Sequence, residues 1–140
     1  MAYCTQSDLL NQLTEAELIQ LTDDAQAGTV DTTKVDAALA AATATIDAYA
    51  GGRYALPLQP SEKIKQLCAD LAIYELEKRR RRIREATLAA RDAALAFLRD
   101  LALGRAVLDQ PSGAAAQSSG ATVKKTEAER IFSEENLEGF

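Results

Sequence analysis

One stripe of apolar side chains gives this sequence its clearest structural signal. Five residues recur at spacings of four, three, four and three positions: Val35, Leu39, Ala42, Ile46 and Tyr49. This is the period of one face of an α-helix. Asp31 can cap the start of that helix. Gly51 and Gly52 can end it, because the position after a helix C-terminus usually takes a positive φ that glycine tolerates. The stripe therefore predicts an amphipathic helix between Asp31 and Gly51.

The residues before this helix carry a second local signal. Thr14 is followed three positions later by Glu17, which is the spacing of a capping box, and the box predicts a short helix beginning there. Either Thr5 or Ser7 can start an earlier turn that runs through Leu13. We therefore expect two short helical pieces before the main helix.

Two longer helices are expected after the loop that holds Pro57 and Pro60. Ser61 can cap the first of them, whose apolar face comprises Ile64, Leu67, Cys68, Leu71 and Tyr74. Gly104 is the natural end of the second, whose apolar stripe comprises Leu88, Leu95, Leu98 and Ala102, with Leu101 beside it. The sequence thus predicts an all-α fold, a small helical bundle of about four to five helices, over residues 1–110.

The length and composition predict a single domain with a thin core. A chain of 140 residues with 47% hydrophobic content is long enough for one compact domain and too short for two. Much of that content is alanine, and tryptophan is absent. Many apolar positions must therefore lie on helix surfaces, so we expect the protein to associate with further copies of itself.

Several classes of function are disfavoured by what the sequence lacks. Histidine is absent, which removes Ser-His-Asp and Cys-His nucleophilic sites and most catalytic zinc sites. No phosphate-binding loop or EF-hand spacing is present. Cys4 and Cys68 match no metal or redox spacing, so we interpret both as small buried hydrophobic residues rather than a disulfide. We therefore expect that the protein is not an enzyme and that it has no catalytic residue, metal or cofactor.

The hydropathy of the chain predicts a protein that works away from membranes. Asp8, Glu15 and Glu17 interrupt any apolar segment near the N-terminus, so the chain does not begin like a signal peptide. No stretch approaches the roughly 18 apolar residues of a membrane span. We therefore expect a protein made and used in the cytosol.

Charge is distributed unevenly along the chain. Residues 1–77 hold four Lys and Arg against twelve Asp and Glu, whereas residues 78–110 hold nine against four. The basic excess comes mainly from Lys78, Arg79, Arg80, Arg81, Arg82 and Arg84. This arginine run has three interpretations: a contact with DNA phosphates, a contact with an acidic surface such as residues 1–77 of a neighbouring copy, or a solvated turn that offsets a helix dipole.

The last thirty residues differ from the rest of the chain. Ser, Gly, Ala and Gln dominate from position 111 to 120, which is typical of a flexible linker. Beyond it, apolar side chains stand in a charged segment, namely Ile131, Phe132, Leu137 and Phe140. An extended C-terminal arm over 111–140 that docks on a neighbouring subunit would explain them. The alternatives are an arm that folds back on its own domain or stays disordered.

Short segments in a fixed order carry a resemblance to a known family. They are IDAYAGGRYALPL at 46–58, CADLAIYELEKRR at 68–80 and AFLRDLALGRAVLD at 96–109, with YCTQSDLL near the start and RIFSEENLEGF at the end. Together they resemble the head-tail adaptor (connector) family of Mu-like tailed phages. The resemblance covers nearly the whole chain.

The resemblance implies a structural protein of the virion. Such proteins assemble in the host cytoplasm as a ring, commonly a dodecamer, beneath the portal protein, and present their other face to the tail or a tail-completion protein. DNA passes through the channel without sequence recognition. The resemblance also makes the loop at Arg53 and Tyr54, and the arm around Phe132 and Phe140, candidates for these contacts. From the residues alone, Tyr54 and Leu56 have the alternative of packing the loop onto the bundle.

One rival function follows from the residues without the resemblance. A helical DNA-binding or regulatory protein would use the arginine run at 78–84 as its phosphate contact, and its affinity for duplex DNA would fall steeply with salt.

Overall fold

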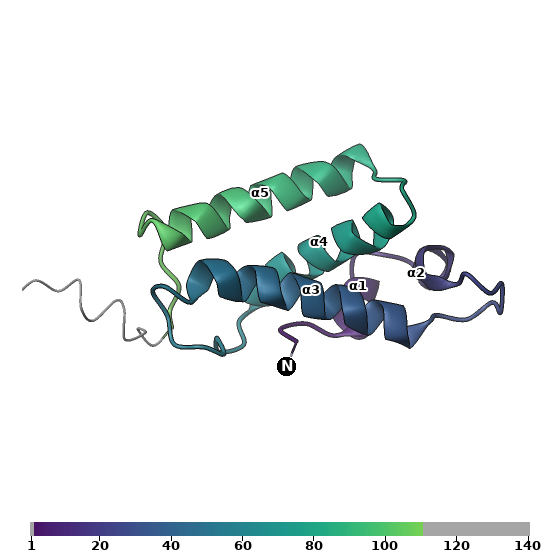
Figure 1. The fold of residues 1–140 in the computed structure, drawn as a ribbon, viewed down its shortest axis with the longest axis horizontal. Helices are drawn as coiled ribbons and strands as arrows, with labels where there is room; N and C mark the ends of the chain where they lie inside the picture. The colour runs from purple at the N-terminus through teal and green to yellow at the C-terminus, as the bar shows by residue number, and fades with distance from the viewer. Residues whose placement is uncertain (1, 111–140) are drawn as a thin grey trace, which may run out of the picture.

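The computed structural model describes residues 2–110, and this part of the chain is all helical (Figure 1). Its helices are α1 (Gln6–Leu10), α2 (Glu15–Thr22), α3 (Thr32–Ala50), α4 (Glu62–Arg79) and α5 (Glu85–Ala102). The predicted all-α bundle is therefore confirmed. The linker and arm predicted over 111–140 lie outside the described residues, so this division of the chain stays a prediction. None of the helices described is long and apolar enough to cross a bilayer.

Helix α4 forms the centre of the bundle. It contacts each of the other four helices, and it lies between α3 and α5, which also contact each other (Figure 1). Half of its eighteen residues are buried, so it has apolar side chains on several faces rather than along one stripe. Of the face predicted from the sequence, Tyr74 alone is only partly buried. The core of the molecule is therefore built around α4.

The predicted helix starts are confirmed. Thr14 Oγ1 accepts a hydrogen bond from the Glu17 N–H at 3.2 Å, and the Glu17 carboxylate accepts one from the Thr14 N–H at 2.8 Å. Asp31 and Ser61 cap α3 and α4 through bonds to the backbone two and three residues ahead. Thr5, rather than Ser7, is the N-cap of α1. The side chains of Thr14, Asp31 and Ser61 fix where their helices begin because they satisfy backbone N–H groups that have no partner within the helix.

The predicted positive φ at Gly51 and Gly52 is wrong. Gly51 has φ −62, because the chain continues for another turn in which the N–H groups of Arg53 and Tyr54 bond to Ala50 O. Glycine gives room for a close approach instead, since a Cβ at Gly51 would lie 2.9 Å from the Asp47 carbonyl oxygen and 3.2 Å from a methyl group of Leu56. Gly104, by contrast, takes the expected positive φ of +77 after α5.

The buried face of α5 is rotated from the one predicted. Leu98 and Leu101 are fully buried, but Leu88 is 42% exposed and Ala102 is also exposed. Thr87 and Ala94 complete the buried face. A polar residue lies in this face because Thr87 has a hydrogen-bond partner inside the bundle, which is described below.

Both cysteines are buried, as predicted, and they lie in contact. Cys4 precedes α1 and Cys68 lies in α4, and the two Sγ atoms are 2.7 Å apart. Both are free thiols. The hydrogen bond that Cys4 donates to Cys68, together with burial, raises the pKa of the Cys4 thiol. The pair fastens the start of the chain to the central helix.

The end of the described chain is held against the loop that follows α3. The Leu108 N–H donates to Tyr54 Oη at 3.0 Å. The Gln110 side chain accepts from the Gln59 N–H at 2.6 Å and donates to the Gln59 carbonyl at 3.0 Å. Residue 110 is thereby fixed at the end of the bundle opposite the turn between α4 and α5 (Figure 1).

Candidate functional site

The arginine run forms the turn between α4 and α5. Arg80 is the C-cap of α4, and Arg81 follows with a left-handed φ of +57. The N–H groups of Arg82 and Arg81 bond to the carbonyls of Glu77 and Lys78 at 3.2 and 3.0 Å. This is the Schellman arrangement, in which glycine is the usual left-handed residue. Here an arginine occupies that position at a cost of about 1 kcal/mol in backbone energy.

A buried carboxylate fixes the other side of this turn. Glu77 is 1% exposed, and its two oxygens accept bonds from the Arg84 N–H at 2.9 Å, Arg84 Nε at 2.6 Å and Thr87 Oγ1 at 3.0 Å. Arg84 is the N-cap of α5, but its own side chain makes no cap bond. Glu77, at the end of α4, therefore anchors the first turn of α5.

Acidic groups of the same chain occupy much of the arginine run. Arg79 and Arg80 pair with Asp24 at 2.7 and 3.0 Å, and Arg84 pairs with Glu17 at 3.2 Å. Hydrogen bonds from Arg79 and Lys34 hold the pKa of Asp24 well below its usual range. The turn thus holds α2 and the loop after it against the end of α4.

Part of the run thus pairs with acidic groups of the same chain, which none of the three interpretations included. These partners are Asp24, Glu17 and Glu77. The three interpretations of the run stay predictions. The uneven charge along the sequence was the signal for such a pairing, but spacing alone does not say which chain supplies the acid. Among residues 2–110, no carboxylate forms an ion pair with Arg81 or Arg82, and Lys78 has only Glu75 at 3.5 Å.

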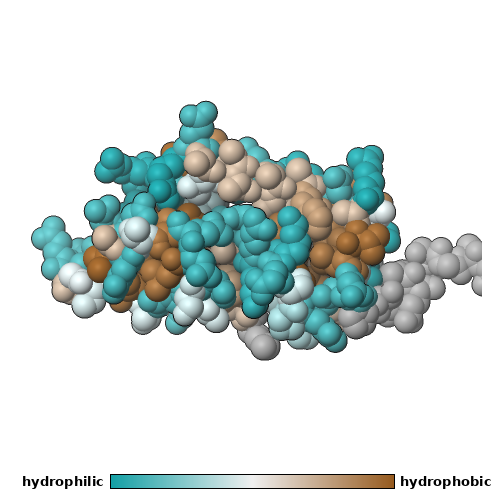
Figure 2. All heavy atoms as spheres, turned by 180° about the vertical axis from the view of Figure 1, so that it is seen from behind, coloured by the Kyte–Doolittle hydropathy of each residue, from teal (hydrophilic) through white to brown (hydrophobic). Residues whose placement is uncertain are grey.

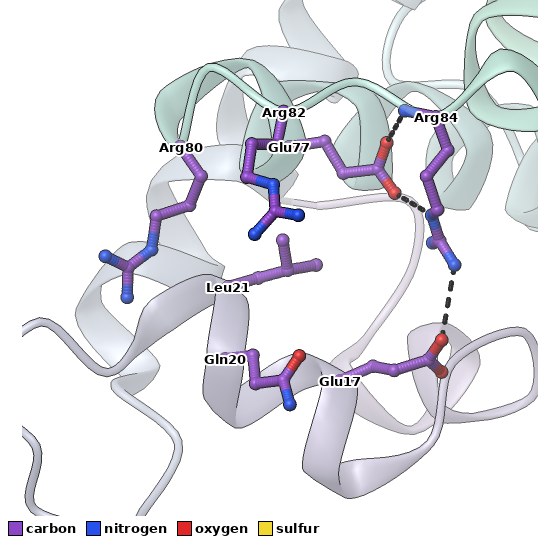
Figure 3. A pocket seen from close by; sticks show the side chains of 7 residues that line it. All are labelled: Glu17, Gln20, Leu21, Glu77, Arg80, Arg82 and Arg84. Atoms are coloured by element: carbon purple, nitrogen blue, oxygen red, sulfur yellow. Dashed lines mark hydrogen bonds and ion pairs between the residues drawn. The ribbon is translucent and has the colours of Figure 1, made fainter.

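The turn overhangs an open pocket of about 720 Å³ between α2 and α4 (Figure 3). Its lining residues are Glu17, Gln20, Leu21, Glu77, Arg80, Arg82 and Arg84. Arg84 bridges Glu77 and Glu17 along one side, while the Arg82 side chain extends towards Leu21 from above (Figure 3). We call this the arginine pocket. Here the Arg82 guanidinium, which has no carboxylate partner in the described part of the chain, lies beside the apolar Leu21 side chain, and this combination suits a ligand that is both acidic and apolar.

The loop after α3 places its two predicted contact residues differently. Tyr54 is buried, and its hydroxyl accepts the Leu108 bond, so it packs the loop onto the bundle. Leu56 is 45% exposed, so it does not share that role. The Arg53 guanidinium lies against Gly104, where a Cβ would be 2.6 Å from Nη1. Gly104 therefore allows the positive φ of the turn and leaves space for the Arg53 guanidinium.

The predicted contact residues of the C-terminal arm, Ile131, Phe132, Leu137 and Phe140, lie outside the described residues. Within residues 2–110, no cluster of three or more Cys, Asp or Glu is arranged to hold a metal ion. The expectation of a protein without catalysis, metal or cofactor stays a prediction.

Comparison with known proteins places the chain in a phage family. The family model described as "Bacteriophage Mu, Gp36" matches residues 3–126, which is most of the chain. A relative from Haemophilus influenzae (strain ATCC 51907 / DSM 11121 / KW20 / Rd), the Mu-like prophage FluMu protein gp36, is 38% identical over 79 residues. That alignment covers 56% of this chain and 56% of the relative. The chain is a Mu-like phage protein and belongs to the bacteriophage Mu Gp36 family.

Proposed function

We propose that this protein is a structural head-tail adaptor subunit of a Mu-like phage. It forms a ring between the portal and the tail, through which DNA passes, and it catalyses no reaction. The observation that carries the proposal is the family match over residues 3–126, which includes the three central segments at 46–58, 68–80 and 96–109 that resemble phage adaptors. A five-helix bundle that exposes many alanines is consistent with a building block of a larger assembly.

Two rows of exposed alanines support lateral packing of such subunits. One row follows α3 at positions 37, 41, 44 and 48, and the other follows α5 at positions 86, 89, 93 and 96. Figure 2 shows a band of weakly hydrophobic side chains along the upper edge, where α5 lies. Different surfaces on α3 and α5 make a head-to-tail contact, which closes into a ring when the rotation between copies is right.

The charge distribution fits an adaptor better than a DNA-binding protein. Arg79, Arg80 and Arg84 are already paired with acidic groups of the chain, so they would have to give up those partners to bind phosphates. The acidic first half of the chain is suited to line a channel, because a neutral or negative wall lets DNA slide without adhering. We therefore propose that the acidic surface, rather than the arginine run, faces the lumen.

The mass of the purified protein in solution tests the proposal. It is measured alone and then mixed with the portal protein of the same phage. We expect a ring-sized species in at least one sample. Replacing Ala93 with Trp should prevent ring formation, whereas Arg99→Trp, an exposed position on another side of α5, should not. A protein that stays monomeric in both samples would refute the proposal.

Arg81 and Arg82 keep one rival function open to test. Because these side chains have no carboxylate partner among the described residues, they are the phosphate contacts that a helical DNA-binding or regulatory protein would use. That rival predicts binding to duplex DNA with a steep salt dependence. It also predicts that Arg81→Glu and Arg82→Glu together abolish this binding while leaving the fold intact.

A further inference from the structure

The arginine pocket has no partner within the described part of the chain that neutralises Arg82. Its other two arginines are balanced, since Arg80 pairs with Asp24, and Arg84 with Glu17 and Glu77. Arg82 extends over Leu21, so its charge lies beside an apolar side chain at the mouth of the pocket (Figure 3). A phosphate backbone would satisfy the charge but not the apolar side chain. A peptide that carries a carboxylate next to an aromatic residue would satisfy both.

This chain contains such a peptide outside the described residues. Positions 127–140 hold five glutamates and one arginine, with Ile131 and Phe132 directly before Ser133, Glu134 and Glu135. We call residues 127–140 the acidic segment. Its charge is opposite to that of Arg82, and its apolar residues match Leu21. Within the chain's sequence, the segment therefore has the chemistry that the arginine pocket lacks.

The positions of the pocket and the chain end allow a contact between copies. Residue 110 is held at one end of the bundle and the pocket lies at the other, separated by α5 (Figure 1). The eighteen residues of α5 are about 27 Å long. Residues 111–126 can span at most about 55 Å, which is enough to reach the chain's own pocket or that of an adjacent subunit, and the proposed ring favours the adjacent one. A subunit with a binding segment at one end and a pocket at the other can make a head-to-tail contact with the next copy, and a ring repeats that contact.

We propose that the acidic segment of one copy docks in the arginine pocket of the next, with Glu134 or Glu135 on Arg82 and Phe132 against Leu21. This inference rests on the proposed ring and adds the contact that links its subunits. It assigns Arg82 to subunit recognition, and it leaves Arg79, Arg80 and Arg84 as groups that hold the pocket in shape.

Photo-crosslinking in the full-length protein tests this docking. Phe132 is replaced with p-benzoylphenylalanine, and copies labelled with nitrogen-15 are mixed with unlabelled copies before illumination. We expect crosslinks from position 132 to residues 17–24 or 80–84, with a large share joining a labelled to an unlabelled copy. Arg82→Glu should lower the yield about tenfold, because it replaces an attraction with a repulsion.

Two further variants make the result specific. Arg99→Glu changes the net charge by the same amount at an exposed site on α5, and it should leave the yield unchanged. Combining Arg82→Glu with Glu134→Arg and Glu135→Arg should restore most of the crosslinking. Circular dichroism of each variant confirms that the bundle remains folded.

Several outcomes would overturn the inference. They are crosslinks confined to single copies, crosslinks to other surfaces, no crosslinks, or a yield that Arg82→Glu does not change. The mass of each sample separates this failure from a failure of the proposed function. A ring that forms without pocket crosslinks refutes only the docking, whereas a protein that forms no ring, alone or with the portal, refutes both.

Discussion

Removal of the Glu77 carboxylate should be among the most damaging single changes to this fold. Glu77→Ala leaves the Arg84 N–H and the Thr87 hydroxyl without their acceptor. A buried polar group left without a partner costs about 1 to 3 kcal/mol. The Arg84 side chain adds little, because it is half exposed and retains Glu17. We therefore expect a loss of about 3 to 4 kcal/mol in the free energy of unfolding.

Urea unfolding followed by circular dichroism measures this loss. Glu75→Ala is the matched control, since Glu75 lies in the same turn of α4 but only pairs with Lys78 at 3.5 Å near the surface. Such a pair contributes less than about 1 kcal/mol. Thr87→Val should cost about 1 kcal/mol, and less when Glu77 is already Ala, because the two share one bond. A Glu77→Ala variant as stable as Glu75→Ala would refute the anchoring role of Glu77.

Three further predictions follow from other features of the structure. Arg81→Gly should stabilise the fold by about 0.5 to 1 kcal/mol. Glycine adopts the left-handed φ without strain, and this gain exceeds the entropy that glycine adds to the unfolded chain. A lower urea midpoint would contradict this prediction. The depressed pKa of Asp24 adds stability that is complete above its usual value of 3.8 and is lost as pH falls through the lower folded-state pKa. The melting temperature of Asp24→Asn should therefore fall less than that of the wild type on acidification from pH 5, and equal slopes would argue against the Asp24 network. Oxidised glutathione should slowly join Cys4 to Cys68 in a disulfide by exchange, which releases two reduced glutathione molecules and lowers the protein mass by about 2 Da. A Cys4→Ser control cannot form this bond. A wild-type mass that stays unchanged after prolonged incubation would show that the two thiols cannot form a disulfide.

The helices were predictable because their signals are local. Thr14 with Glu17, and Ser61 with the apolar positions that follow, lie within one or two turns of the structure they specify. Each of these signals depends on residues fewer than about eight positions apart. Over so short a stretch, few backbone conformations compete with the helix.

The errors arise where a turn or a side-chain hydrogen bond, rather than an apolar period, decides the local structure. The face of α5 is set by Thr87 bonding to Glu77, and no hydrophobic period predicts a buried threonine. The Gly51 conformation depends on a further turn of the chain and on the approach of Leu56. The burial of Cys4 and Cys68 was predicted, but their contact was not, because it joins residues 64 positions apart. Sequence spacing carries no information on which distant residues meet.

The candidate site was predictable as a location but not as an arrangement. The sequence singled out the arginine run because six basic residues stand within seven positions. It gave no indication that Asp24 and Glu17 would bind three of them, or that Arg82 would remain over a pocket. The sequence contains many carboxylates that could pair with an exposed arginine. Only the tertiary structure decides which of them lies close enough to do so.

The bonds that hold Leu108 and Gln110 to the loop after α3 have a consequence for kinetics. They fix the position of residue 110 on each subunit, so the distance from that point to a docking site on a neighbouring subunit is set by the assembly. In an assembled ring, a docking site at that distance meets the acidic segment at an effective concentration in the millimolar range. An individually weak contact would then be occupied most of the time, and each subunit could release and rebind its neighbour without the ring coming apart.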